Sequence, residues 1–223
     1  MDTPNDVALY SNLCQKSLLR AKDFFETHLQ EIKKDRQDHF IGSKEETSEF
    51  YNYFEDIISA IIFAYTSIEA LANICIPSNY KYIKEGGDSG KKTIYSKKAI
   101  EREFTLRDKL KNVLSEVLYT ENVAQEQWWP LFIDLENYRN EIIHTKQVES
   151  EERYSKLLSK KVFEIIQVYK LIIEYYGKHI ADYRPGLLTE FPYGFGHDSI
   201  YPSLTSEEGY KDWIKTLYNP SSF

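Results

Sequence analysis

Residues 57–76 read IISAIIFAYTSIEALANICI, and nearly every position in this stretch is apolar or small. A run of about 20 apolar residues is long enough to cross a membrane. Thr66, Glu69 and Asn73, however, recur at helical spacing and form a polar seam along one face. Because this seam and the acidic residues before the run are unfavourable in a bilayer, the stretch predicts a central helix over 47–76 that is packed on most sides and is not a membrane span.

The composition of the chain favours helices and a single core. The 223 residues include only 9 Gly and 7 Pro, and 28% are charged. A net charge of −7 argues against a nucleic-acid binder that works by bulk positive charge, but it is compatible with a local basic cleft. Cys14 and Cys75 are isolated and the N-terminus carries no signal pattern. We therefore expect a cytoplasmic setting, with no disulfide framework, metal or cofactor.

Apolar spacing predicts further helices over about 4–32, 105–119, 128–144 and 149–177, the last ending at Gly177. Residues 78–95 are expected to form a basic surface loop; they lack the first glycine and the preceding strand of a phosphate-binding loop. These elements predict an all-α antiparallel helical bundle of about five main helices over residues 1–182. Residues 183–223 are rich in Pro, Gly and aromatic side chains. They predict an irregular C-terminal arm with a short amphipathic helix.

A second stretch, residues 128–146, reads WWPLFIDLENYRNEIIHTK. Its apolar residues recur every three or four positions, and Arg139 projects within about 20° of Trp128, in the middle of the apolar arc. A guanidinium does not lose its proton, so its burial requires a partner, and Glu69 on the central helix is the natural one. Five residues after Arg139 stands His144, whose type of side chain titrates near neutral pH.

The pattern of Arg139, Asn140, three further residues and His144, with the segment Ser67–Asn73 of the central helix, resembles the HEPN family of small all-helical proteins. The resemblance covers about residues 46–176. It implies a metal-independent endoribonuclease of the toxin or antiviral-defence kind, which cuts RNA as a homodimer. In family members neutralised by a partner nucleotidyltransferase, a Tyr lies two residues after the His. Here that position is Lys146, so that modification is not expected, Lys146 is assigned to RNA binding, and an antitoxin stays a candidate partner.

The chemistry of such a cleavage explains these residue types. Attack by the RNA 2′-hydroxyl needs one group to accept its proton, one to protonate the leaving 5′-oxygen, and positive charge on the phosphate. His144 suits the proton transfers and Arg139 suits the phosphate, while Asn140 is expected to orient the imidazole or to bind phosphate. Since one chain supplies a single His in the motif, a two-fold dimer is expected to place two copies around one cleft.

Two other classes of function stay open. A non-catalytic helical module would bind a nucleotide, RNA or a protein partner through the same cleft, and a structural dimer would use the C-terminal arm as its clasp. In the purely structural interpretation, Arg139 and Glu69 form a buried ion pair and His144 caps a helix. Two copies of Arg139 and His144 that converge at a subunit interface would favour the nuclease.

Overall fold

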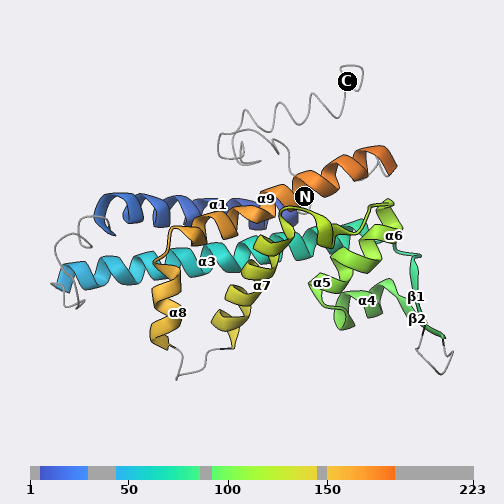
Figure 1. Cartoon of the computed structure of the whole chain (residues 1–223), viewed down its shortest axis with the longest axis horizontal. Coiled ribbons are helices and arrows are strands. Elements are labelled where there is room, and N and C mark those ends of the chain that lie inside the picture. Colours follow the sequence, from blue (N-terminus) through green and yellow to red (C-terminus); the bar gives the residue numbers. More distant parts are fainter. Residues whose placement is uncertain (1–5, 30–43, 86–91, 145–149, 184–223) are drawn as a thin grey trace, which may run out of the picture.

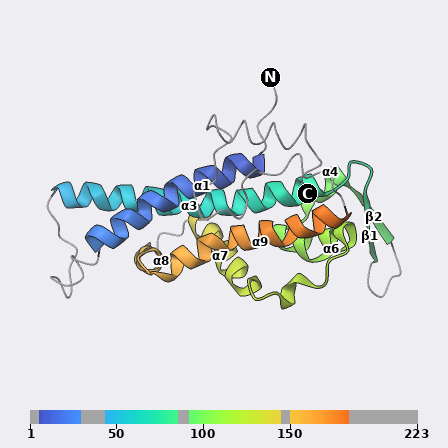
Figure 2. The same ribbon diagram turned by 90° about the horizontal axis from the view of Figure 1, so that it is seen from above.

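The computed structural model describes residues 6–29, 44–85, 92–144 and 150–183, and it confirms the all-α class. The three longest helices are α1 (Asp6–Phe24), α3 (Lys44–Cys75) and α9 (Lys161–Tyr183). They lie side by side along the longest axis of the molecule (Figure 1, Figure 2). α1 runs antiparallel to α3, whereas α9 runs in the same direction as α3, because the elements between them carry the chain back.

Those intervening elements are β1 (Lys81–Glu85), β2 (Lys92–Ser96), α4 (Lys97–Glu103), α5 (Leu106–Asp108), η2 (Lys109–Val113), α6 (Leu114–Leu118), η3 (Val123–Gln125), α7 (Trp129–Ile143) and α8 (Ser150–Leu157). In the view of Figure 1, α4, α5 and α8 lie below α3, α6 lies level with the end of α3, and α7 crosses α3. α5, η2 and α6 follow one another without a break and together form the helix predicted over 105–119. η1 (Phe25–Leu29) continues α1.

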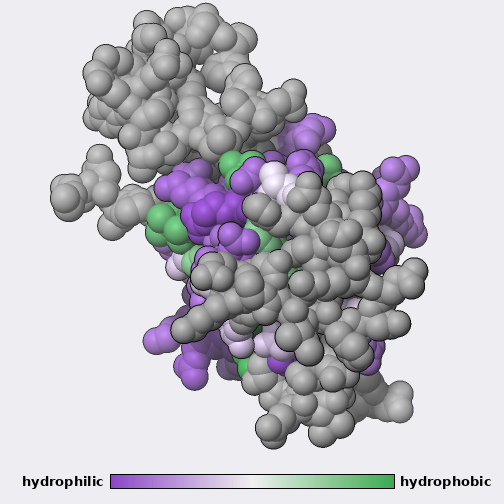
Figure 3. All heavy atoms as spheres, turned by 90° about the vertical axis from the view of Figure 1, so that its left-hand side faces the viewer, coloured by the Kyte–Doolittle hydropathy of each residue, from purple (hydrophilic) through white to green (hydrophobic). Residues whose placement is uncertain are grey.

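α3 is the central helix, as predicted. Ile57, Ile61, Ile68 and Leu71 on α3 are all fully buried, and α3 contacts α1, α7 and α9. By length and apolar composition alone, Ser48–Cys75 would also suffice to span a membrane. Viewed from the end at which α3 begins, the described surface is mainly hydrophilic with separate hydrophobic patches (Figure 3).

The structure corrects the expectation of a loop over 78–95, because β1 and β2 pair there as an antiparallel hairpin. Tyr82 lies opposite Tyr95, and both rings pack against the ring of Phe104, the C-cap residue of α4. Alternating aromatic and β-branched residues suit a strand with one packed face, and that local pattern outweighed the surrounding charge. Ile83 and Ile94 form the opposing pair on the other face, where they are 51% and 62% exposed.

The helix predicted over 149–177 is also corrected, since it is two helices and does not stop at Gly177. The hydroxyl of Ser159 accepts a hydrogen bond from the Lys161 N–H at 3.3 Å and so caps the start of α9. α9 continues through Gly177 to Tyr183, because the fully buried Tyr176 and Ile180 on either side of the glycine fix the helix in the core. The predicted arm over 183–223 lies outside the described residues, apart from Tyr183 at the end of α9.

A buried hydrogen bond joins α3 to the end of α8, where the Tyr53 hydroxyl donates to the Leu157 carbonyl oxygen at 2.6 Å. We expect Tyr53→Phe to lower the free energy of unfolding by about 1–2 kcal/mol, since that oxygen loses its buried donor. Tyr51→Phe is the matched control, because the Tyr51 side chain is 68% exposed on the same helix and should change stability by less than about 0.5 kcal/mol. Urea denaturation measures both variants, and equal effects would contradict the assignment.

Candidate functional site

α7 (Trp129–Ile143) carries the predicted site near its C-terminal end. The helix begins at a Trp-Pro step, where Pro130 is tolerated because a first-turn N–H has no partner within the helix. Phe132 and Leu135 are fully buried and Trp128 is 7% exposed, so the first half of α7 is anchored in the core. From there α7 crosses α3 obliquely and its C-terminal end reaches the edge of the molecule (Figure 1).

The buried charge on α7 is Glu136, whereas the sequence had predicted Arg139. Glu136 is 7% exposed, and Arg107 of α5 donates to its Oε2 through Nε at 2.9 Å and through Nη2. The Tyr65 hydroxyl donates to Oε1 at 3.3 Å. Hydrogen bonds at both oxygens compensate the burial of this carboxylate. Glu136 and Arg107 were missed because their positions in the sequence resemble those of ordinary surface charges.

We expect Glu136→Ala to lower the free energy of unfolding by about 1–3 kcal/mol, because Tyr65 and Arg107 lose a buried, charged acceptor. Asp134→Ala is the matched control on the same helix, since its ion pair with Lys161 at 2.9 Å is largely exposed and contributes about 0–1 kcal/mol. Thermal and urea denaturation of the two variants measures the difference. A Glu136→Ala variant as stable as the control would contradict the role given to this carboxylate.

Arg139 is half-buried, and its guanidinium lies over the Tyr65 ring, 5.0 Å from the ring centroid. Nη1 donates to Oδ1 of Asn140 at 3.1 Å. The predicted ion pair between Arg139 and Glu69 is wrong: within the described residues no such pair forms, and Glu69 turns to a different cation. Burial raises the pKa of the Tyr65 phenol, Glu136 and Glu69 raise it further, and Arg139 opposes them. Both Glu69 and Arg139 therefore act on Tyr65 without pairing with each other.

The partner of Glu69 is Lys109 of η2, a residue that the sequence did not single out. The Lys109 ammonium is fully buried, 3.7 Å from Oε1 of Glu69, and donates to Oδ1 of Asn73 at 3.0 Å and to the Glu101 carbonyl oxygen at 3.1 Å. Burial lowers the pKa of Lys109 from its ordinary value of 10.5, while Glu69 and Glu101 act in the opposite direction. The polar seam of α3 thus binds a lysine of its own domain, which leaves the Arg139 guanidinium for other contacts.

Asn140 and His144 stand at the exposed end of α7. The helix ends at Ile143, and His144 is the C-cap residue, with φ −103°, ψ 56° and its N–H donating to the Asn140 carbonyl oxygen at 2.9 Å. Because Asn140 lies one turn before His144 and also accepts from Arg139, it connects the two residues. His144 thus stands at the C-cap position that the purely structural interpretation gave it, and its backbone N–H makes the cap hydrogen bond. Lys146 lies outside the described residues.

α8 adds further cations beside this end of α7. Arg153 donates through Nη1 to the Glu141 carbonyl oxygen at 3.5 Å, and Lys156 lies 3.4 Å from the Glu141 carboxylate. Lys156 also pairs with Glu152, and this hydrogen bond raises the pKa of the Lys156 ammonium. The α7 terminus therefore presents Arg139, Asn140 and His144 with two basic side chains of α8 close by.

The arrangement combines groups that bind anions with a group that transfers protons. Arg139 offers a guanidinium whose orientation is restrained by the Tyr65 ring, and Asn140 adds an amide. His144 is exposed and is the single histidine of the motif. In the described parts of the chain, no group of three or more His, Cys, Asp or Glu side chains is placed to hold a metal ion.

Comparisons with known proteins do not assign a family to this chain. No protein-family model matches it, and neither does any curated protein or any solved structure. The resemblance to the HEPN family therefore depends on the motif Arg139, Asn140 and His144 and on the central helix that bears Glu69.

Proposed function

We propose that the protein is a metal-independent endoribonuclease of the HEPN type, which cuts RNA by attack of the 2′-hydroxyl at a composite site between two protomers. The observation that carries the proposal is the environment of Arg139. Among the described residues, no carboxylate forms an ion pair with this guanidinium, which is shared between Tyr65 and Asn140 at the accessible end of α7. The alternative, a buried ion pair between Arg139 and Glu69, does not form, because the Glu69 carboxylate pairs with Lys109.

Each residue has a role that follows from its chemistry. The Arg139 guanidinium binds the non-bridging oxygens of the scissile phosphate through its fork of donors and stabilises the charge that develops there. His144 accepts the proton of the 2′-hydroxyl or donates one to the leaving 5′-oxygen. Asn140 keeps Arg139 in place through its side-chain oxygen and offers its amide N–H groups to the phosphate or to the imidazole.

The proposal requires two protomers, because in an in-line attack the 2′-hydroxyl and the leaving 5′-oxygen lie on opposite sides of the phosphorus, and one imidazole does not reach both. A two-fold homodimer supplies the second His144 and the second Arg139. Ile143, next to His144, is 46% exposed and would contribute apolar contact area to such an interface. Activity of this kind fits a cytoplasmic toxin or an antiviral-defence effector, and an antitoxin would then act by covering the α7 termini.

A cleavage assay in a chelator tests the proposal. The purified chain is incubated with labelled single-stranded RNAs in EDTA, and matched oligonucleotides with 2′-deoxy or 2′-O-methyl groups at the cleaved positions are the controls. We expect RNA products with 2′,3′-cyclic phosphate and 5′-hydroxyl ends, and intact control oligonucleotides. Cleavage of the 2′-modified controls would contradict the mechanism. Binding of RNA without cleavage of any sequence would favour the non-catalytic module.

A further inference from the structure

A second polar site lies at the corner between the β1–β2 hairpin and the helices that follow it. Its floor and wall are three aromatic rings, Tyr82, Tyr95 and Phe104. The Phe104 ring lies 5.4 Å from the Tyr82 ring and 5.0 Å from the Tyr95 ring, and it is nearly perpendicular to both. All three side chains are only partly buried. The cavity measures about 170 Å³, several times the roughly 30 Å³ that one water molecule occupies.

The rim of this pocket mixes hydrogen-bond donors and acceptors. Lys84 donates, Asn112 both donates and accepts, and the carboxylates of Asp108 and Glu103 accept. Asp108 accepts a hydrogen bond from the Thr105 hydroxyl at Oδ2, 2.8 Å away, which restrains the carboxylate. A flat aromatic ligand with donors and acceptors along one edge would match a pocket of three rings with this rim, and an unpaired nucleobase has that character.

The charge of the hairpin and α4 beside the pocket suits a phosphate backbone. Their described residues, 81–85 and 92–103, carry six Lys or Arg and three Glu residues, in a chain whose formal net charge is −7. Two of those acids are already paired, Glu85 with Lys92 at 2.9 Å and Glu101 with Lys97 at 3.7 Å. The hairpin and α4 therefore form a locally positive region within an acidic protein, which attracts a phosphate backbone, while the Asp108 and Glu103 carboxylates in the pocket are acceptors for the donors of a base.

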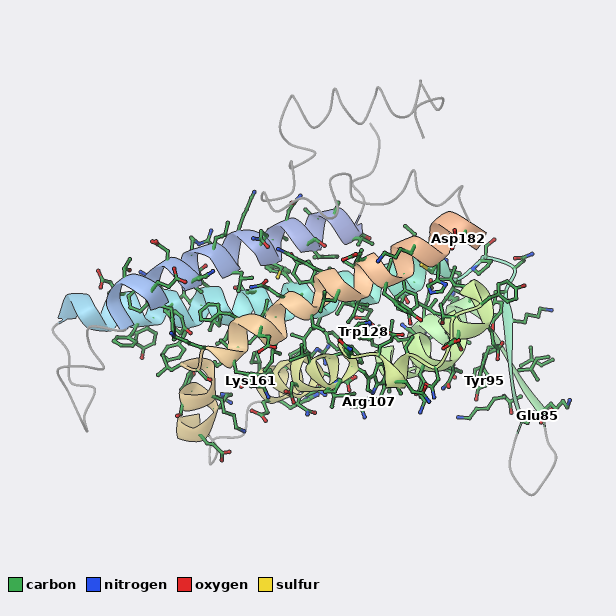
Figure 4. The ribbon with its side chains drawn as sticks, turned by 45° about the horizontal axis from the view of Figure 1, so that its top comes forward. Glu85, Tyr95, Arg107, Trp128, Lys161 and Asp182 are labelled. Carbon is green, nitrogen blue, oxygen red and sulfur yellow. The ribbon has the colours of Figure 1, made fainter. Side chains whose placement is uncertain are left out.

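α5 connects this pocket to the α7 terminus. Arg107 faces α7 and binds Glu136, which lies one turn before Asn140, and the next residue, Asp108, lines the pocket. Arg107 is labelled at the lower side of the helices and Tyr95 toward the hairpin in Figure 4. α5 thus contacts α7 through Arg107 and lines the pocket through Asp108.

We propose that the Tyr82–Tyr95–Phe104 pocket is a binding site for one unpaired nucleotide of single-stranded RNA, with the base against the rings and its edge on Asp108 and Asn112. Lys84 binds the adjoining phosphate. This proposal rests on the proposed function, because it takes RNA as the ligand. It adds a second site at which the RNA substrate is bound, away from the scissile phosphate. Stacking on aromatic rings tolerates every base, while the carboxylate at the rim favours bases with exocyclic amino groups.

Photo-crosslinking and fluorescence anisotropy with the full chain test this site. The probe is a short single-stranded oligonucleotide with 2′-O-methyl riboses and one photoreactive 6-thioguanosine, whose base keeps an exocyclic amino group, so that it binds but is not cut by the proposed reaction. We expect crosslinks to Tyr82 or Tyr95. Tyr95→Ala should weaken binding roughly 5- to 150-fold, the range measured when one stacked base loses its aromatic partner.

Two further variants make the result unambiguous. Asn112→Phe fills the pocket from the helical wall and leaves the hairpin sequence intact, so it should weaken binding as Tyr95→Ala does even if the latter loosens the strands. Tyr51→Ala is the control, because this 68% exposed ring lies at the far end of α3 and should bind RNA like wild type. Wild-type affinity in both pocket variants would overturn the proposal, as would binding of an arginine-rich peptide in place of RNA.

The outcomes separate this site from the proposed nuclease. If wild type cuts no RNA yet crosslinks at Tyr95, the pocket is supported and the cleavage site fails. If wild type cuts RNA and both pocket variants cut it at the same rate and with the same sequence preference, the pocket fails and the cleavage site stands.

Discussion

Replacing His144 by alanine is expected to reduce RNA cleavage by about 10²- to 10⁴-fold, the contribution of a positioned general acid or base. The imidazole is exposed at the end of α7, beyond the last helical residue. Its removal should therefore leave the free energy of unfolding within about 0.5 kcal/mol of the wild-type value. Cleavage rates in EDTA, together with urea denaturation, measure both quantities. Loss of activity together with stability would indicate a structural role for His144.

Arg139 gives the companion test, because the guanidinium is assigned to the phosphate and not to proton transfer. Arg139→Ala should reduce cleavage about 10²- to 10³-fold, as removal of one stabilising donor does elsewhere, and Arg139→Lys should restore only part of it because an ammonium lacks the planar fork. Arg20→Ala is the control: this arginine is 63% exposed on α1 and pairs with Asp56. Wild-type cleavage by both Arg139→Ala and His144→Ala would remove the proposed site.

Mixed dimers test whether the site is composite. If each cleft needs both copies of His144, a heterodimer of wild type and His144→Ala should lose most of its activity. If each protomer acts alone, the same heterodimer should keep about half, because one complete site per dimer survives. Differently tagged chains purified as the mixed species provide the measurement, and half activity would contradict the two-histidine mechanism.

The sequence predicted α3 correctly but assigned the wrong partner, Arg139, to Glu69 of α3. The helical spacing of apolar residues gives the direction in which each side chain leaves the helix, but it does not tell how far along the helix the core extends. Arg139 does point toward the apolar side, yet α7 leaves the core after Leu135, so Tyr138 and Ile142 are only half-buried and Arg139 reaches solvent. Glu136, nearer the start, takes the buried position.

The partner of Glu69 was missed for a related reason. Lys109 lies on η2, 36 residues after Asn73, and its long side chain reaches the polar seam of α3. Its ammonium is buried at a position where the apolar spacing predicts an apolar side chain. The β1–β2 hairpin was missed because its strands are short and flank a Gly-rich segment, while the information that fixes it is the packing of Tyr82 and Tyr95 on Phe104. Tertiary contacts decide both features.

The Lys109 network should dominate the stability of this region. Replacing Glu69 and Asn73 by leucine together removes both side-chain acceptors of a fully buried ammonium. We expect the double variant to lose about 3 kcal/mol, the lower end of the cost of leaving a buried charge unpaired, because the Glu101 carbonyl oxygen still accepts one hydrogen bond. Adding Lys109→Met should restore most of the lost free energy of unfolding, since an apolar cluster of similar volume then replaces the unpaired Lys109 ammonium.

The pH dependence of unfolding in the same variants tests whether Lys109 carries the buried charge. The pKa of Lys109 in the folded chain lies below its ordinary value of 10.5, so between these two values the unfolded chain binds more protons and stability rises with pH. Loss of Glu69 lowers this pKa further, because that carboxylate opposes the effect of burial. Urea denaturation as the pH approaches 10.5 should thus show the double variant regaining stability relative to the triple variant, which has no amine to titrate. A double variant that tracks the triple variant at every pH would show that Lys109 does not carry the buried charge.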